Sequence, residues 1–196
     1  MEIIFATNNP HKAVEAGEIL GPSFNIVTPA SLGFGGDIPE THPTIRENSL
    51  QKAFFIWEKF HKTCFADDTG LEIDALGGAP GVWSARYAGN DKNSASNRAK
   101  VLRELEGVSF EKRTARFLCV VTLIEDGRAT VFEGTCKGHI ALEDRGGAHG
   151  FGYDSIFIPN GLEVTMADIP IAEKDALSHR GEAMGKLKCH LLKKQD

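Results

Sequence analysis

The fold is decided most clearly by residues 115–143, ARFLCVVTLIEDGRATVFEGTCKGHIALE. The run FLCVVTLI, residues 117–124, is apolar at almost every position, which is typical of a strand covered on both faces. Asp126 and Gly127 follow this run, and such a dipeptide favours a tight turn between two strands. We therefore predict a β-meander here, with its first strand at the centre of a sheet and helices over it.

Strand and helix patterns alternate before this segment. EIIFA, residues 2–6, predicts a short strand, and the helix after it begins near Asn9, a good N-cap, and Pro10, which suits a first turn. The next strong helix pattern begins at Thr44 and Glu47, which have capping-box spacing. Such alternation followed by a meander predicts an α/β protein with one central, mixed and twisted sheet flanked by helices.

Other elements follow from the same kinds of pattern. Hydrophobic residues at helical spacing predict one apolar face for the helix after Thr44, made by Leu50, Ala53, Phe54, Trp57 and Phe60. The remaining predicted elements are a strand over 64–66 that ends at Asp67, a structured glycine-rich loop over 76–90, a helix over 94–107, a strand over 155–159 and a C-terminal helix with Ala183, Leu187 and Leu191 on one face.

Composition limits the class of protein. The chain has 196 residues, which suits one domain, 1–196, and its net charge of −5 counts against a general nucleic-acid binder. No apolar run approaches the ~18 residues of a membrane span, and the acidic start MEIIF does not suit a signal peptide. The four cysteines have neither zinc-site nor redox spacing, so we expect a reducing, cytoplasmic location.

Polar residues stand where the first strand ends and the first helix begins. Backbone N–H groups and the helix dipole at such a place attract anions. Lys12 lies in the first helical turn, where the dipole alone would disfavour it, and this conflict points to an anionic ligand. Taken alone, the segment fits an ordinary capped helix with a solvated lysine equally well.

Two adjacent acids, Asp67 and Asp68, follow the predicted strand over 64–66. A carboxylate at a strand end can hold Mg²⁺ or activate water. Neighbouring residues on an extended chain point to opposite sides, so we expect only one of the two to face a given site. The alternative is an Asx-type turn, which is common at strand ends.

Two further segments could bind a nucleotide. GFGYD, residues 150–154, places glycines around Phe151, so that backbone and ring could both approach a flat base. Arg180, in SHRG, presents a donor fork that suits phosphate or a carbonyl oxygen. The alternatives are a β-bulge whose aromatic residues belong to the core and a solvated helix cap. Together the four segments suit Mg²⁺-dependent hydrolysis of a nucleoside triphosphate, and the chain has no Walker loop, kinase loop or zinc signature.

The order of TNNPHK, ADDTGLEIDALGGAPGVWSARYAG, GFGYDSIF and EKDALSHRGEA resembles the inosine/xanthosine triphosphate pyrophosphatase family, from near Ile3 to the last helix. The resemblance implies two lobes with an active-site cleft between them, and a homodimer. It also implies Mg²⁺-dependent cleavage of the α–β phosphate bond of ITP, dITP, XTP and dXTP. The products are the monophosphate and pyrophosphate, so the activity would remove deaminated purines from the nucleotide pool.

The resemblance also implies roles for individual residues. Asp68 would be the general base for the attacking water and a metal contact, Thr69 would touch substrate, and Arg180 would read the 6-oxo group of the base. The triphosphate would be bound by Thr7, Asn8, Asn9, Pro10, His11 and Lys12, the base by Phe151, Gly152, Tyr153 and Asp154, and Lys174, His179 and Arg180 would complete the site.

The chain departs from the family pattern in three places. Pro39 stands where many relatives have a glutamate proposed to contact Mg²⁺, and Glu40 or water would then replace that contact. His149 replaces a smaller residue before GFGYD, where it could touch phosphate or be exposed, and Ser155 replaces proline, from which we expect only a local loosening.

Two other functions remain open, and one interface is suggested. A nucleotide-binding module without catalysis, such as a sensor, would bind dITP without turnover. A pyrophosphatase for modified pyrimidines would prefer dUTP or methylated substrates. The helix over 54–60 has more aromatic surface than one core face needs, which makes it a candidate dimer interface.

Overall fold

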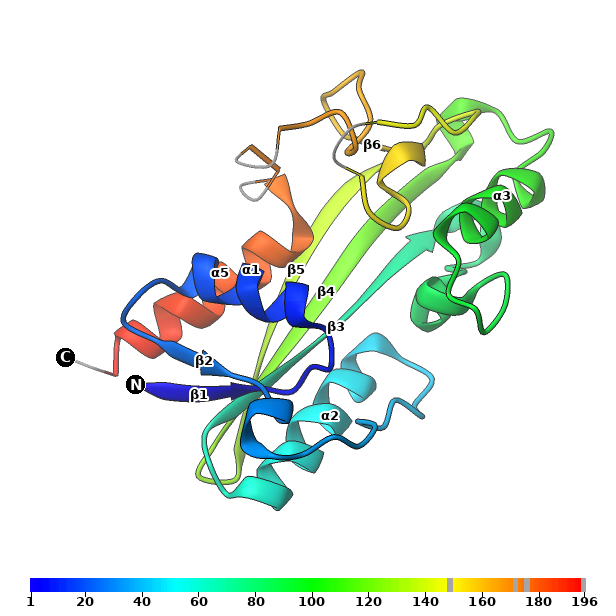
Figure 1. The fold of residues 1–196 in the computed structure, drawn as a ribbon. Coiled ribbons are helices and arrows are strands. Elements are labelled where there is room, and N and C mark those ends of the chain that lie inside the picture. Colours follow the sequence, from blue (N-terminus) through cyan, green and yellow to red (C-terminus); the bar gives the residue numbers. More distant parts are fainter. Residues whose placement is uncertain (148–149, 171–172, 175–176, 195–196) are drawn as a thin grey trace. The chain divides into compact units, whose positions relative to one another are not determined.

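The computed structural model describes residues 1–147, 150–170, 173–174 and 177–194, without the side chain of His11. In these residues a six-stranded sheet has the order β2-β1-β3-β4-β5-β6 (Figure 1). The strands are β1 (Glu2–Phe5), β2 (Asn25–Val27), β3 (Cys64–Ile73), β4 (Thr114–Glu125), β5 (Arg128–Ile140) and β6 (Phe157–Pro159), and the helices are α1 (Pro10–Leu20), α2 (Ile45–Phe60), α3 (Ser94–Glu104) and α5 (His179–Leu192). β1 runs parallel to β2 and β3, whereas β6 runs antiparallel to β5, so the predicted α/β fold with a mixed sheet is confirmed.

The predicted turn between the two long strands is confirmed. Asp126 and Gly127 connect β4 to β5 with φ angles of 48° and 74°, as a type I′ hairpin turn requires. β4 is central and covered on both faces. Its Cys119, Val121 and Leu123 pack in one core cluster with α1 and α5, while Ile124 packs in another with α2.

The start of α2 is confirmed, and its predicted apolar face is confirmed in part, because Ala53 is buried but the most buried stripe of the helix also contains polar residues. Thr44 caps the helix by accepting a hydrogen bond from the Glu47 amide at 3.2 Å, and its hydroxyl donates to the Glu47 carboxylate. The buried stripe contains three polar residues, Asn48, Ser49 and Lys52, which have partners inside the fold. The aromatic residues that we expected on that face are half-buried at its edge and pack against the same cluster: Phe54, Trp57 and Phe60.

The strand at Asp67 does not end where the pattern predicted. β3 continues through Asp67 and Asp68 to Ile73, so both acids lie inside a ten-residue strand. They lie just beyond the carboxyl end of β1, since Phe5 and Phe65 are the last residues that pair between β1 and β3. The helix α3 likewise ends at a different residue than predicted, at Glu104 and not at Gly107. The local sequence pattern correctly places polar residues at the end of a strand. It does not show that the strand which ends beside the two acids is β1, while β3 continues through them.

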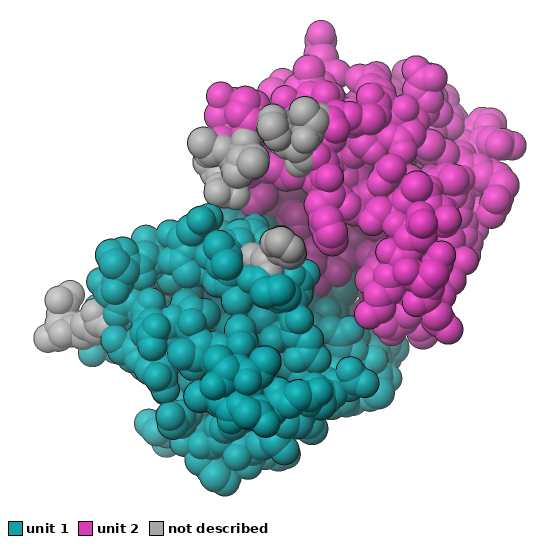
Figure 2. Space-filling view, in the orientation of Figure 1, with its two compact units in different colours: residues 1–68, 119–134, 180–196 teal, residues 69–118, 135–179 magenta. Residues whose placement is uncertain are grey.

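The chain divides into two compact units (Figure 2). Unit 1 contains residues 1–68, 119–134 and 180–196, and unit 2 contains residues 69–118 and 135–179. The predicted pair of lobes with a cleft stays a prediction. No helix in the described parts of either unit is both long and apolar enough to cross a bilayer.

Candidate active site

A buried carboxylate in unit 1 joins three elements of that unit. Asp67, on β3, has a side chain only 2% exposed. Lys12, from the first turn of α1, donates to both Asp67 oxygens at 2.8 and 3.0 Å. The Nε of Arg180, in the first turn of α5, lies 3.6 Å from Oδ2 of Asp67. One acid therefore holds two cations in place.

The charges around Asp67 keep it ionised. Burial alone raises the pKa of Asp67, but Lys12, Arg180 and Lys52 outweigh burial and hold this pKa well below its usual range. Burial lowers the pKa of Arg180, and Asp67 and Glu15 outweigh it and raise that pKa. Glu15 of α1 accepts hydrogen bonds from Arg180 at 3.2 and 3.3 Å. The side chains of Lys12 and Arg180 stay 25% and 19% exposed, so a ligand can still reach them.

Asp68 has a different set of partners, as the alternation of β3 predicts. Lys52 Nζ, from α2, lies 2.9 Å from Asp68 Oδ1 and 2.5 Å from Glu40 Oε1. Burial raises the pKa of Asp68, and Lys52 only partly opposes this effect. For Lys52, burial lowers the pKa, but Asp68, Asp67 and Glu40 outweigh burial and raise it to about 12. A cationic lysine thus lies between two acids, one of which ionises less readily than usual.

The convergence of Asp68 and Glu40 on one nitrogen suits a divalent cation as well. Their oxygens already meet around one positive charge, and hard carboxylate oxygens are the ligands that Mg²⁺ prefers. Within the described residues, no three His, Cys, Asp or Glu side chains gather as a metal site. A Mg²⁺ ion held here would therefore take its remaining ligands from water or from substrate phosphates.

The polar turn before α1 is organised as predicted. The carbonyl of Asn9 accepts the first helical hydrogen bond, from the Ala13 amide at 3.3 Å, as expected of an N-cap. The Asn9 amide donates to the Thr7 hydroxyl at 3.1 Å, and the Asn8 side chain donates to the Gly36 carbonyl at 3.3 Å. Pro10 begins the helix, and the predicted contact of His11 falls on a side chain outside the described residues.

Thr69 follows the two acids and belongs to unit 2. Its hydroxyl is buried, and it has no hydrogen-bond partner among the described residues. A buried hydroxyl without a partner costs free energy unless something else pairs with it. This observation supports the predicted contact between Thr69 and substrate.

The GFGYD segment forms a fixed loop in unit 2. The Phe151 side chain is 79% exposed, while its amide donates to Asp154 Oδ2 at 2.9 Å. Lys174 Nζ also donates to Asp154 Oδ2, at 2.5 Å. Gly152 has a φ of 60°, a conformation that favours glycine. An exposed ring on a hydrogen-bonded loop can stack on a flat ligand.

Two predicted residues in unit 2 have structural partners of their own. Tyr153 is buried and its hydroxyl donates to the Ser84 carbonyl at 2.7 Å, so a contact with the base would pass through the Tyr153 backbone. The His179 ring stacks on the Phe117 ring, with 4.8 Å between the ring centroids. Ser155 is buried, and His149 lies outside the described residues.

Comparisons with known proteins agree with this geometry. A family model described as "Ham1 family" matches residues 3–190. The chain belongs to the Ham1 family. It is 46% identical to the dITP/XTP pyrophosphatase of Bacillus subtilis, over 95% of this chain and 94% of that one. It is 45% identical to the dITP/XTP pyrophosphatase of Thermoanaerobacter pseudethanolicus, over 99% and 98%.

Solved structures show the same Ham1 fold. The Ham1 protein of Staphylococcus aureus matches with a TM-score of 0.91 and 36% identity, over 99% of this chain and 100% of that one. A HAM1 protein from Coxiella burnetii also matches with a TM-score of 0.91 and 38% identity, over 98% of this chain and 99% of that one. The resemblance inferred from the sequence is therefore confirmed.

Sequence reasoning missed three residues of this candidate site. Asp67 was set aside because its neighbour was expected to face the site, yet Asp67 meets Lys12 in the fold. Lys52 carried a signal that went unused, because a lysine at helical spacing from Ala53 and Ile56 falls on a buried stripe. Glu15 gave no local signal, since its partner Arg180 is 165 residues away.

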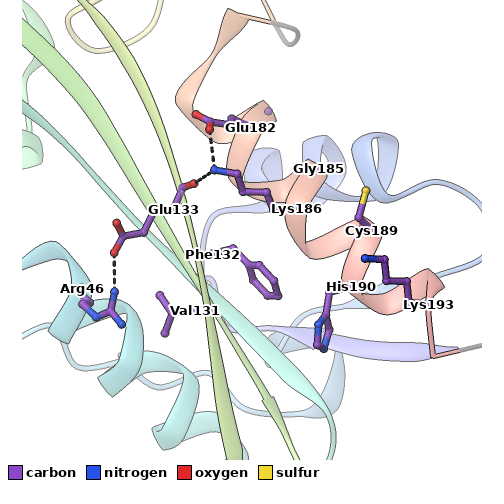
Figure 3. Close-up of a pocket in the computed structure, with 11 residues that line it drawn as sticks. Arg46, Val131, Phe132, Glu133, Glu182, Gly185, Lys186, Cys189, His190 and Lys193 are labelled. Carbon is purple, nitrogen blue, oxygen red and sulfur yellow. Dashed lines mark hydrogen bonds and ion pairs between the residues drawn. The ribbon is translucent and has the colours of Figure 1, made fainter.

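An open pocket elsewhere in unit 1 of the Ham1 chain contributes none of these residues. It measures about 810 Å³ and lies along α5 and β5 (Figure 3). Its charges are paired with one another: Arg46 of α2 contacts Glu133 of β5 at 2.7 Å, and Lys186 contacts Glu182, one turn away on α5, at 2.7 Å. All four side chains are about half exposed, and such pairs contribute little.

Proposed function

We propose that this protein hydrolyses non-standard purine nucleoside triphosphates, dITP and ITP or dXTP and XTP, to the monophosphate and pyrophosphate in the presence of Mg²⁺. The observation that carries the proposal is the pair of acids on β3, each bound to its own lysine. The names of the curated relatives, dITP/XTP pyrophosphatase, support the same substrate class.

Asp68 is the proposed general base. A carboxylate whose pKa is raised by burial accepts a proton more readily at neutral pH than an ordinary aspartate does. Asp68 would take the proton of the attacking water, and Lys52 would hold the carboxylate in place. Asp68 and Glu40 would hold Mg²⁺, which when bound neutralises phosphate charge.

The phosphates are assigned to the turn before α1 and to its lysine. Thr7, Asn8 and Asn9 lie at a helix N-terminus, where the helix dipole attracts anions, and Lys12 adds a full charge there. The base is assigned to the GFGYD loop, where Phe151 would stack on it and Asp154 would contact it. Lys174 and His179 would complete the site.

Arg180 is the proposed reader of the 6-oxo group. A donor at this position rejects adenine, because a buried donor would then face the 6-amino group unpaired. Guanine shares the 6-oxo group, so rejection of GTP would depend on its 2-amino group.

A product-resolved assay tests the proposal. The enzyme is incubated with dITP, ITP, XTP, ATP or GTP, with and without Mg²⁺, and pyrophosphate and phosphate are measured separately. We expect Mg²⁺-dependent pyrophosphate from dITP and XTP and little from ATP or GTP. Free phosphate would mean that another bond is cleaved. Saturable dITP binding without turnover would favour a sensor. Faster turnover of dUTP than of dITP would favour a pyrimidine pyrophosphatase.

Replacing Glu40 with glutamine is expected to raise the Mg²⁺ concentration for half-maximal activity about tenfold. The amide keeps the size of the side chain but removes one of the two negative charges around Lys52. The measurement is a Mg²⁺ titration of dITP hydrolysis, with Glu58→Gln as control, since Glu58 is exposed on α2, the helix that carries Lys52. An unchanged titration curve would remove Glu40 from the metal assignment.

We also propose a cytoplasmic homodimer. All four cysteines are free, which suits a reducing compartment. Leu50, Phe54 and Phe55 of α2 line a second pocket of about 460 Å³, which supports this helix as the interface candidate. Gel filtration with light scattering decides the oligomeric state, and a monomer would overturn the dimer.

A further inference from the structure

One arginine of α3 contacts the loop that carries Phe151. Arg98 donates through NH1 to the Gly152 carbonyl at 2.9 Å and through Nε to Asp144 Oδ2 at 2.6 Å. Gly152 directly follows Phe151, and all of these residues belong to unit 2. The guanidinium fork thus joins a helix to both ends of the segment 144–152.

Asp144 is a firm anchor for this fork. Its Oδ1 accepts the Gly146 amide at 3.1 Å. Burial raises the pKa of Asp144, but its hydrogen bonds, which include those from Arg98 and the Gly146 amide, outweigh burial and lower it. The carboxylate is therefore ionised at neutral pH, and its bond to Arg98 is charge-assisted, which makes it stronger than a neutral bond.

The helix that carries Arg98 is itself well anchored. Asn93 caps α3 by accepting a hydrogen bond from the Ser96 amide at 2.9 Å. Val101 and Leu105, at the other end of this segment, are fully buried in the core of unit 2. Arg98 therefore projects from a rigid element, and a group bound to it is held as firmly as the helix.

The residue before Arg98 holds the neighbouring loop. Asn97 accepts a hydrogen bond from the Ala88 amide at 2.7 Å and donates to the Ala85 carbonyl at 3.1 Å. Tyr153 reaches the same loop through the Ser84 carbonyl. Two consecutive residues of α3 thus fix the loop over 81–88 and the loop that carries Phe151.

The consequence is a fixed backbone under an exposed ring. The Phe151 amide is held by Asp154, and the next carbonyl is held by Arg98, yet the Phe151 side chain is 79% exposed. A preorganised loop binds a flat ligand without first losing conformational entropy. The contacts of Arg98 are thus placed to control how well the ring meets a base.

We propose that Arg98 is a positioning residue that fixes the backbone at Phe151 and Gly152, with Asp144 as its anchor, and so sets the affinity for the nucleotide base. This inference rests on the proposed function, because it takes the base to stack on Phe151.

The test compares Arg98→Leu and Asp144→Ala with Arg103→Leu, which changes an exposed arginine on the same helix. In both test variants the KM for dITP is expected to rise about tenfold, with kcat changed by less than about twofold. Inhibition by pyrophosphate, which carries no base, stays at the parent's level. The KM of Arg98→Lys for dITP is expected to lie between those of the parent and Arg98→Leu, because lysine keeps the charge but lacks the planar donor fork.

Hydrogen exchange of peptides covering 150–156 gives a readout that needs no catalysis. We expect faster exchange there in Arg98→Leu than in Arg103→Leu. Unchanged KM and unchanged exchange would overturn the proposal, and so would an equal loss of dITP and pyrophosphate affinity. If the parent releases no pyrophosphate from dITP, the proposed function fails, and the exchange comparison still decides whether Arg98 positions the loop.

Discussion

Replacing Asp68 with asparagine is expected to slow pyrophosphate release from dITP about 10³-fold, because asparagine cannot accept the proton of the attacking water. Asparagine has nearly the same shape, and Glu40 remains beside Lys52, so the fold should persist. The loss should appear in kcat as well as in kcat/KM, since the proton is transferred in the transition state. The measurement is single-turnover release of pyrophosphate at saturating Mg²⁺.

Asp126→Asn is the matched control for this variant. Asp126 is exposed in the β4–β5 turn, and asparagine also tolerates its positive φ of 48°. The control should keep the parent's rate, and both proteins should give the parent's circular dichroism spectrum. An Asp68→Asn enzyme that kept about a tenth of the parent's rate would show that Asp68 is not the base.

Replacing Asp67 with asparagine is expected to lower the free energy of unfolding by about 3 to 5 kcal/mol, because it leaves two partly buried cations without their shared counter-ion. The side chain of Asp67 is 2% exposed, so a neutral amide at this position leaves Lys12 without its carboxylate partner and Arg180 with Glu15 alone. For a chain of this length the melting temperature should fall by about 10 °C. Thermal unfolding followed by circular dichroism measures the change.

Added pyrophosphate distinguishes an anion site from a purely structural ion pair. We expect it to raise the melting temperature of Asp67→Asn more than that of the parent, because an anion bound at the exposed parts of Lys12 and Arg180 supplies the negative charge that asparagine lacks. Glu15→Gln is the control: Glu15 is 34% exposed, and its loss should cost less than about 1 kcal/mol. If Asp67→Asn were no less stable than this control, Asp67 would not be the centre of the cluster.

Local signals located most elements correctly. The capping box at Thr44, the turn at Asp126 and Gly127, and the buried side of α5 all depend on residues close together in sequence. One prediction was wrong and another was incomplete where the deciding contacts are distant in sequence. The strand at Asp67 continues to Ile73, and the buried face of α2 contains Lys52, because partners elsewhere in unit 1 satisfy these charged groups.

The order of elements, the α/β class and the segments TNNPHK, ADDTG, GFGYD and SHRG can all be read from the chain, because periodicity, capping and turn chemistry are local properties. The partner of each charged residue cannot be read from the chain. Lys12 meets Asp67 across 55 positions and Arg180 meets Glu15 across 165, and such pairs exist only when the strands and helices have packed. The division of the two acids, with Asp67 holding the cations and Asp68 beside Lys52 and Glu40, therefore arises from tertiary structure, since burial and distance set the charge and partners of each carboxylate.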